Sequence, residues 1–367
     1  LRHLARWCRR TRVRTPLALQ PARGWIERQP LGVVGLISPW NYPVQLALAP
    51  AIGALAAGNR VMLKPSELTP HTSAQLAALV AQYFAPEEFC VVQGDAATAA
   101  LLASLPFDHL VFTGSTAVGR KVAQAAAANL TPTTLELGGK SPAIIDADCD
   151  MRDAALKIAH GKLLNAGQTC IAPDYVLLPR GSEAAFAEAY RAAVARLFPY
   201  FEGNPDYASI ITPRHLARLR TMLQQAQTQG ADLQVMQSVP GSPAPPPQGI
   251  GDGVGRQMAP VLVFGATAGM QLMQEEIFGP VLPVLSYERL DDAIAHINAG
   301  PRPLALYWFG RSDVVRDDVL RRTVSGGVSV NDTLMHIAHA RLPFGGVGDS
   351  GWGAYHGEQG FLRFCHQ

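Results

Sequence analysis

The sequence lacks the features that mark membrane, secreted and zinc-binding proteins. None of its apolar runs approaches the ~20 residues that a helix needs to cross a bilayer, and its start, Leu1-Arg2-His3-Leu4, has no apolar signal segment. Its five cysteines are scattered and include no CxxC pair, which argues against a disulfide framework and against a zinc site. We therefore expect reduced thiols, a cytoplasmic location, no membrane span and no metal.

Strong charge of one sign is also missing. Charged residues make up 16% of the chain and the formal net charge is +2, so no global field favours nucleic acid or an anionic membrane. Six arginines do lie between Leu1 and Arg14. They could form a nucleic-acid patch, but a solvated helix face is the favoured interpretation. Because the chain has no initiator Met, we expect that the true N-terminus is missing.

What is present is typical of a globular α/β protein. With 367 residues, 48% of them hydrophobic, the chain can form about two domains. From Leu31 to Leu137, short apolar runs alternate with Ala-rich stretches, which predicts a doubly wound parallel sheet with ligands at the carboxyl ends of its strands. The predicted strands are 33–37, 61–63, 89–92, 110–112 and 133–137, and the predicted helices are 44–57, 73–83 and 118–128.

A second α/β series begins near Asp150. Ser238 to Met258 is rich in Pro and Gly, and we interpret it as an exposed excursion within this second domain. The sequence contains no internal repeat. Helices are predicted at 154–164, 183–197 and 291–297, and strands at 175–178, 281–285 and 304–309.

Cys170 is the strongest candidate for chemistry. It ends the run Asn165-Ala-Gly-Gln-Thr-Cys170, and Glu136 stands 34 positions earlier in a Glu-Leu-Gly-Gly-Lys segment. Small residues beside each side chain let a ligand approach the backbone, which suggests a nucleophile and a base. Taken alone, the two residues are better explained as a buried structural cysteine and an unrelated surface glutamate, and the other segments described below reverse that preference.

Other segments place polar groups after predicted strands. Gly114-Ser115 opens a helix, where free N–H groups suit a diphosphate, but the segment matches neither GxGxxG nor the Walker A pattern, so a structural turn is an alternative. Lys64 and Glu67 could hold a ribose, and Asn41, between two prolines, could donate to an oxyanion. Taken singly, these two segments could instead be a helix-capping loop and an ordinary Asn turn.

Two clusters resemble metal sites without matching one. His336 and His339 have no third ligand beside them, so we expect packing or pocket lining. The four aspartates between Asp146 and Asp153 lack the Gly and the closing Glu of a calcium loop. We expect them to cap the helix that follows Cys149, where acids complement the helix dipole.

Together these segments resemble the aldehyde dehydrogenase superfamily from about Arg23 to Phe364. Their order along the chain is highly specific, and finer detail resembles the branch with class 3, fatty-aldehyde and bacterial coniferyl-aldehyde dehydrogenases. The motifs are Trp40-Asn41-Tyr42-Pro43, Lys64 with Glu67, Gly114-Ser115-Thr116, Glu136-Leu137-Gly138-Gly139-Lys140, Gly167-Gln168-Thr169-Cys170, Glu276-Ile277-Phe278-Gly279-Pro280 and Pro343-Phe344-Gly345-Gly346. The branch details are Cys170 to Tyr175, Pro303 to Tyr307 and Gly353 to Phe364.

The resemblance implies a role for each motif. Cys170 would be the nucleophile, Glu136 the base that activates hydrolytic water, and Asn41, with the Cys170 backbone N–H, the oxyanion hole. The implied cofactor is NAD, with NADP tolerated. Its implied contacts are Lys64 and Glu67 for the adenosine ribose, Gly114 and Ser115 for the diphosphate, Glu276 for the nicotinamide ribose and Phe278 beside the ring, with Trp40 as a further cofactor contact.

The family fold would divide the chain into a doubly wound NAD-binding domain and a second α/β catalytic domain. We expect a truncated N-terminal helix and arm at 1–29, the dinucleotide-binding domain at 30–138, the catalytic domain at 139–344 and a C-terminal return segment at 345–367. Family members carry more chain at both ends, including segments that often contact a second subunit. The homodimer that the resemblance implies therefore stays open.

The implied reaction oxidises an aldehyde to a carboxylic acid through a thiohemiacetal and then a thioester on Cys170. Hydrophobic aromatic, coniferyl-type or long aliphatic aldehydes are the favoured substrates. A CoA-acylating dehydrogenase is one alternative, although it would not need the Glu136 carboxylate. A non-catalytic protein that kept the fold is another, against which the complete set of Asn41, Glu136 and Cys170 argues.

Overall fold

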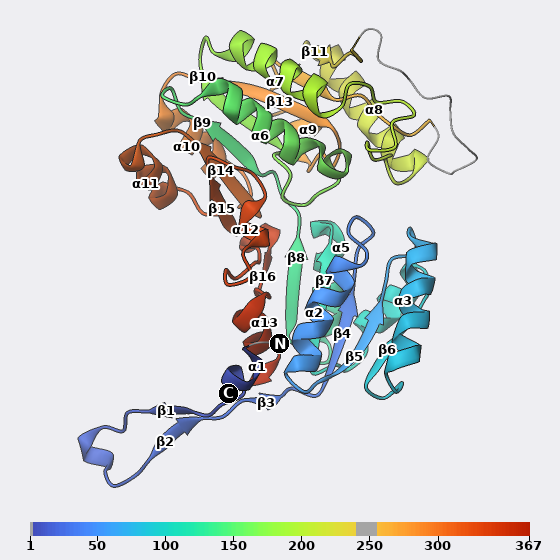
Figure 1. Ribbon diagram of the computed structural model, residues 1–367, viewed down its shortest axis with the longest axis vertical. Helices are drawn as coiled ribbons and strands as arrows, with labels where there is room; N and C mark the ends of the chain where they lie inside the picture. Colours follow the sequence, from blue (N-terminus) through green and yellow to red (C-terminus); the bar gives the residue numbers. More distant parts are fainter. Residues whose placement is uncertain (1–2, 240–254) are drawn as a thin grey trace. The chain divides into compact units, whose positions relative to one another are not determined.

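The computed structural model describes residues 3–239 and 255–367, which form two compact units (Figure 1). Unit 1 comprises 1–137, 339–345 and 351–367, and unit 2 comprises 138–338 and 346–350. Most of the expected excursion at 238–258 lies outside the described residues. Among the residues described, no helix has the length and apolar character needed to cross a bilayer.

Unit 1 is built on a six-stranded sheet in the order β16-β8-β7-β4-β5-β6. All neighbours pair in parallel except β16, which pairs antiparallel with β8. The strands are β4 Val33–Ile37, β5 Arg60–Lys64, β6 Phe89–Val91, β7 His109–Gly114, β8 Thr133–Leu137 and β16 Gly351–Trp352.

Successive strand residues point to opposite faces of this sheet, and an apolar cluster covers each face. Leu36 and Val111 pack in one apolar cluster with residues of α2 and with Phe361 and Phe364, whereas Leu110 and Leu135 pack in another with residues of α4 and α5. This confirms the predicted doubly wound sheet. The helices are α2 Gln45–Ala56, α3 Pro70–Tyr83, α4 Ala96–Ala103, α5 Thr116–Ala127 and α13 Gly357–Arg363.

The sequence had suggested one solvated helix face for the arginine-rich start of the chain, and the structure differs. In the described part of this start, from residue 3 to residue 14, only α1, Leu4–Trp7, is helical, and β1, Thr11–Val13, pairs antiparallel with β2, Gly24–Ile26. The β-branched Thr11 and Val13 favour a strand over a helix, which the charge pattern did not reveal. Arginines 9, 10, 12 and 14 are exposed, so the solvation part of that expectation is confirmed. A second short pair joins β3, Gln29–Pro30, to β17, Cys365–His366.

Unit 2 contains a seven-stranded sheet in the order β11-β12-β13-β10-β9-β14-β15. Only the edge strand β11 is antiparallel to its neighbour. The strands are β9 Pro142–Ile145, β10 Tyr175–Pro179, β11 Asp232–Val235, β12 Val261–Phe264, β13 Val281–Tyr287, β14 Ala305–Phe309 and β15 Gly327–Val330.

The helices of unit 2 include α6, which leads to the candidate nucleophile. Asp150 caps its start by accepting the backbone N–H groups of Arg152 and Asp153, which confirms the expected capping for this one aspartate, whereas Asp148 accepts the Arg311 N–H at 2.9 Å. The helices are α6 Met151–Leu163, α7 Glu183–Leu197, α8 Pro213–Thr228, α9 Gln271–Gln274, α10 Leu290–Ala299, α11 Asp313–Arg322 and α12 Met335–Ala338.

Candidate active site

In unit 1, the predicted site residues gather at the carboxyl ends of four adjacent parallel strands. Trp40 and Asn41 follow β4, Lys64 ends β5, Gly114 ends β7, and Glu136 is the penultimate residue of β8. The strand order β8-β7-β4-β5 puts all of these strand ends on one edge of the sheet. This is the edge at which open α/β sheets bind ligands.

The start of α5 offers an anion site at this edge. Ser115 is its N-cap, and its hydroxyl accepts the Val118 N–H at 3.4 Å. The first-turn N–H groups of a twelve-residue helix carry partial positive charge, which suits a diphosphate. The donor set at Gly114-Ser115 therefore fits the diphosphate of a dinucleotide.

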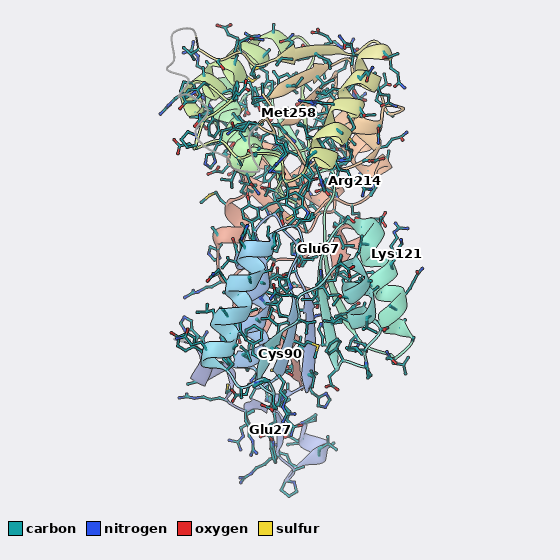
Figure 2. The ribbon with its side chains drawn as sticks, turned by 90° about the vertical axis from the view of Figure 1, so that its right-hand side faces the viewer. Glu27, Glu67, Cys90, Lys121, Arg214 and Met258 are labelled. Carbon is teal, nitrogen blue, oxygen red and sulfur yellow. The ribbon has the colours of Figure 1, made fainter. Side chains whose placement is uncertain are left out.

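Lys64 and Glu67 form an ion pair, with 2.6 Å between Lys64 Nζ and Glu67 Oε2. The lysine side chain is 3% exposed and the glutamate side chain 43%. Burial is the largest single influence on the pKa of Glu67 and acts to raise it, but the hydrogen bond from Lys64, a backbone hydrogen bond and the charge of Lys64 together outweigh burial, and the pKa is lowered. Glu67 lies at the end of the sheet where these strands terminate, whereas Cys90 on β6 lies away from it (Figure 2).

Glu136 is buried in unit 1, at 3% exposure. Its Oε1 atom has no hydrogen-bond partner among the described residues, and burial raises the pKa of this carboxyl well above its usual value. The strand that carries Glu136, β8, is held by β16, in which Gly351 pairs with Glu136. Gly351 has φ +125°, and a Cβ there would overlap the Leu135 carbonyl oxygen, so the pairing requires glycine.

In unit 2, three consecutive left-handed residues turn the chain out of α6 toward Cys170. Asn165, Ala166 and Gly167 have φ values of 52°, 51° and 78°. Gln168 then fixes the loop: its Nε2 donates to the carbonyl oxygens of Asn165 and Ser209 at 3.0 and 3.1 Å. Its Oε1 accepts a backbone N–H at 2.9 Å. Cys170 follows this anchor and is partly exposed, as a nucleophile must be.

The nucleophile loop packs directly against the Glu276–Phe278 turn. Gly167 lies so close that a Cβ there would overlap the Gly279 carbonyl oxygen. Phe278 itself has φ +53°, an uncommon conformation for an aromatic residue. Unit 2 therefore brings together the predicted nucleophile and the turn that carries Glu276 and Phe278.

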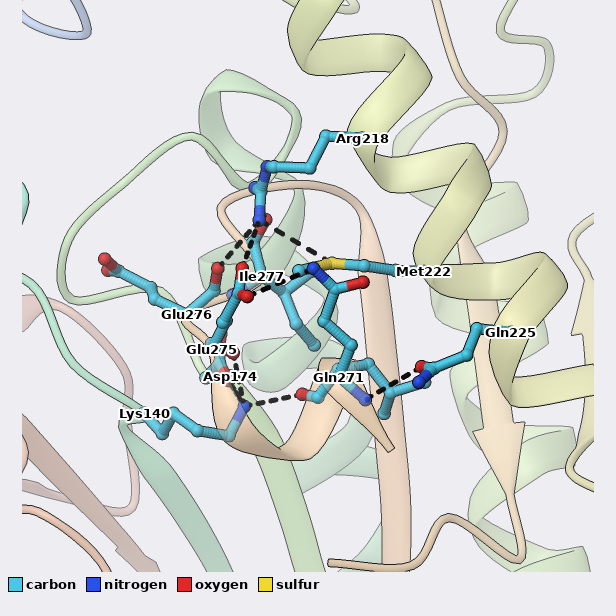
Figure 3. Close-up of polar contacts among 10 residues, drawn as sticks. Lys140, Asp174, Arg218, Met222, Gln225, Gln271, Glu275, Glu276 and Ile277 are labelled. Carbon is cyan, nitrogen blue, oxygen red and sulfur yellow. Dashed lines mark hydrogen bonds and ion pairs between the residues drawn. The ribbon is translucent and has the colours of Figure 1, made fainter. Parts of the chain in front are cut away.

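A polar network pins the backbone of this turn (Figure 3). Lys140 forms an ion pair with the buried Asp174 and donates to the carbonyl oxygens of Leu272 and Glu275 at 2.8 and 3.1 Å. Asp174 also accepts the Ile277 N–H at 2.9 Å. Sequence analysis assigned no role to Asp174, although it stands in the run Cys-Ile-Ala-Pro-Asp that was compared with one branch of the family.

Arg218 completes the network from α8. Its guanidinium donates to the carbonyl oxygens of Glu276, at 3.2 Å, and of Ile277. Sequence analysis missed this residue, because nothing near it in the chain signals a contact some 59 positions away. Both ends of the Glu276–Ile277 segment are thus held by charged side chains, which makes the turn a rigid support.

The Glu276 carboxylate faces the loop after β8. It accepts a hydrogen bond from the backbone N–H of Gly139. Burial, and then the nearby Asp174 carboxylate, raise the pKa of Glu276 to about 8. A carboxyl group held this way can bond ribose hydroxyls, so its chemistry fits the predicted cofactor contact.

Burial makes three of the other cysteines, Cys90, Cys149 and Cys365, poorer nucleophiles. Burial, with four surrounding aspartates, raises the pKa of Cys149 to about 11. Burial also raises the pKa of Cys90 and of Cys365. A thiol with a raised pKa has less reactive thiolate at neutral pH, so these three cysteines are weaker candidates for the nucleophile than Cys170.

Comparison with known proteins settles the family. The aldehyde dehydrogenase family model matches residues 1–367. The chain belongs to the aldehyde dehydrogenase family. A probable coniferyl aldehyde dehydrogenase of Pseudomonas aeruginosa is 49% identical over 363 residues, which cover 99% of this chain and 74% of the relative. The 4,4'-diaponeurosporen-aldehyde dehydrogenase of Staphylococcus aureus is 41% identical, covering 100% and 77%.

Solved structures agree. The substrate-bound state of Staphylococcus aureus AldH has a TM-score of 0.90 at 40% identity, covering 100% of this chain and 77% of that one. An aldehyde dehydrogenase of Mycobacterium tuberculosis in complex with NAD+ has a TM-score of 0.83 at 32% identity, covering 95% and 70%. The chain is thus similar to about three quarters of each of these dehydrogenases.

The predicted family, α/β fold class and enzyme class are confirmed by these comparisons. The enzyme is an oxidoreductase whose class of reaction is the oxidation of an aldehyde to an acid. A nicotinamide dinucleotide is the cofactor that the relationship supports. The roles of individual residues stay predictions, as do the boundaries of the predicted domains.

Proposed function

We propose that this aldehyde dehydrogenase oxidises a hydrophobic aldehyde, aromatic (coniferyl-type) or long aliphatic, with NAD as the preferred cofactor. The observation that carries the proposal is the nucleophile loop: left-handed residues and the Gln168 anchor present a partly exposed Cys170 beside the Glu276–Phe278 turn. The names of relatives at 49% identity support the coniferyl-type substrate.

Cys170 performs the first covalent step. Its thiolate attacks the aldehyde carbon and forms a thiohemiacetal, whose oxyanion is stabilised by N–H donors. Asn41 supplies a side-chain donor and Cys170 its own backbone N–H. Each such donor contributes roughly 3 kcal/mol in comparable oxyanion sites.

The bound cofactor supplies the hydride acceptor. On this chain, Gly114 and Ser115 would hold its diphosphate, Lys64 and Glu67 its adenosine ribose, and Glu276 and Phe278 its nicotinamide side, with Trp40 as a further contact. Glu67 repels a 2′-phosphate whereas Lys64 attracts one, so NAD is preferred and NADP is tolerated.

Glu136 acts on the thioester that remains on Cys170. It takes a proton from water, the water attacks the acyl carbon, and the carboxylic acid leaves with the thiolate restored. Burial raises the pKa of Glu136 above its usual value, which makes its carboxylate a stronger base toward water.

We also expect the enzyme to work in the cytoplasm as a homodimer. Free thiols support a reducing compartment, since all five cysteines are unpaired as disulfides. Light scattering on the purified protein tests the dimer, and localisation of a tagged chain tests the compartment.

A spectrophotometric assay tests the function. Purified enzyme is given NAD or NADP with coniferaldehyde, benzaldehyde and alkanals of increasing length, and reduced cofactor is followed by absorbance. We expect turnover without CoA, highest with a hydrophobic aldehyde, lost in Cys170→Ala and kept in Cys149→Ala and Cys8→Ala. Activity that depends on CoA would identify an acylating enzyme, and full activity of Cys170→Ala would refute the mechanism.

A further inference from the structure

The hydroxyl group of Tyr307 is bonded to the turn that carries Cys170. Tyr307 lies in β14 and is fully buried. Its hydroxyl donates to the backbone carbonyl of Ile171, the residue that follows Cys170. The backbone of Leu334 hydrogen-bonds the same phenol oxygen. One buried side chain thus links the nucleophile turn to the segment after β15.

The carbonyl that Tyr307 holds belongs to a β-turn. The Ala172 N–H donates to the Thr169 carbonyl at 2.9 Å, which makes Cys170 and Ile171 the two central residues. Because peptide groups are planar, fixing the Ile171 carbonyl restricts the rotation of the whole turn. The direction of the Cys170 side chain and of its N–H depends on that rotation.

Strand register explains how Tyr307 reaches the turn. Tyr307 pairs with Ala143 of β9, which lies between β14 and β10, the strand that begins shortly after the nucleophile turn. Leu306 and Trp308 pack in the apolar cluster with α10, so Tyr307 points to the other face of the sheet. Burial raises the pKa of Tyr307 well above 10, so the hydroxyl keeps its proton and stays a donor.

We propose that Tyr307 is a positioning residue for the nucleophile: its hydroxyl holds the Ile171 carbonyl and thereby orients the Cys170 thiol and backbone N–H for attack on the aldehyde. Gln168 anchors the chain before Cys170, and Tyr307 anchors it after. The inference rests on the proposed role of Cys170. It affects the steps at Cys170 that need the thiol and its backbone N–H, and it leaves cofactor binding unchanged.

Tyr307→Phe removes the donor and keeps the ring. We expect the rate constant of the first turnover, measured as reduced cofactor in a stopped-flow experiment, to fall about tenfold or more, because small misplacements of reacting groups have effects of this size. The KM for NAD should stay within about twofold of the unchanged enzyme, because no cofactor contact is altered.

Tyr287→Phe is the matched control. Tyr287 lies on β13 of the same sheet, is buried, and donates its hydroxyl to the Ile145 carbonyl at 2.8 Å. The variant therefore loses a bond of the same kind, far along the chain from Cys170. We expect a similar loss of thermal stability in both variants and a first-turnover rate unchanged only in Tyr287→Phe.

A substitution that restores the donor separates the effect of the hydrogen bond from the effect of packing. Tyr307→4-aminophenylalanine restores an N–H donor at the same place, and we expect its first-turnover rate to return toward that of the unchanged enzyme. If Tyr307→Phe fails to fold, this variant still tests the idea, because a slow first turnover in a folded, donor-bearing variant overturns it.

The two proposals fail in different ways. If Tyr307→Phe is as fast as Tyr287→Phe while Cys170→Ala is inactive, Tyr307 does not position the nucleophile and the proposed function stands. If Cys170→Ala oxidises aldehydes, the proposed function itself is wrong, whatever Tyr307 does.

Discussion

The two carboxylate oxygens of Asp174 bind two different partners, and Asp174→Asn removes one of the two oxygens. The residue is 3% exposed, bonds Lys140 through one oxygen and accepts the Ile277 N–H through the other. Asparagine has a single carbonyl oxygen. Whichever way its amide turns, either Lys140 or the Ile277 N–H faces a second donor and loses its acceptor.

The expected loss follows from the surroundings of Lys140. Breaking a buried ion pair by removing one partner costs about 3–5 kcal/mol. The lysine side chain is 12% exposed and keeps two backbone carbonyl acceptors, at Leu272 and Glu275. The free energy of unfolding should therefore fall by about 3 kcal/mol, the lower end of that range. The turn that carries Glu276 should also loosen, which raises the KM for NAD.

Urea unfolding at pH 7 measures the loss, with Glu288→Gln as the control. That variant breaks the Arg180–Glu288 pair, which is 2.6 Å long but 68% and 62% exposed, so it should cost less than about 1 kcal/mol. Equal losses in the two variants would refute the view that the network around Asp174 supports the turn.

Three further changes give separate tests. Glu67→Gln should raise the ratio of NADP to NAD efficiency (kcat/KM) about tenfold, because one repulsive charge is gone; an unchanged ratio would show that the ribose contact is misassigned. Burial raises the pKa of Glu136 in the folded state. Its contribution to the free energy of unfolding is therefore present in full below the pKa of the unfolded state and is lost as pH rises through the pKa of the folded state. Glu136→Gln should therefore gain melting temperature relative to the unchanged enzyme between pH 5 and 9, and parallel curves would contradict the burial. Gly351→Ala should cost more than about 2 kcal/mol, since φ +125° disfavours any side chain there and the Leu135 carbonyl blocks it, and a melting temperature within a degree would disprove that fit.

Hydrophobic periodicity was enough to place much of the fold. The strands 33–37 and 133–137 and the helix 183–197 were predicted with the bounds that the structure has. The strand 33–37 is a continuous apolar run, the strand 133–137 alternates its two leucines with Glu136, and large apolar residues recur every three to four positions in the helix, which are the patterns of buried strands and amphipathic helices. The helix α8 was missed although Leu216, Leu219 and Met222 recur at helical spacing, because its many polar residues mask that pattern. β9, Pro142–Ile145, was also missed, and it begins with proline, a residue that is depleted in strands.

The residues of the site also fall into two groups, those that local sequence could identify and those that it could not. Cys170 and Glu136 stand in runs of small residues, so local sequence singled them out. Asp174, Arg218 and Tyr307 could not be found this way, because their partners are distant in the chain: Tyr307 and Ile171 are 136 positions apart. Strand order and register bring such pairs together, and no local pattern encodes either.

The covalent thioester on Cys170 is the centre of the account, and Glu136→Gln tests it most directly. The variant is mixed with excess NAD and aldehyde, reduced cofactor is followed in time, and the protein is then weighed intact by mass spectrometry. The account predicts about one equivalent of reduced cofactor per site, then very slow turnover, with the acyl mass on Cys170, because thioester hydrolysis lacks its base. Normal turnover would place the base elsewhere. The absence of both the burst and the adduct would show that Glu136 is needed before the thioester forms, which contradicts the proposed division of roles.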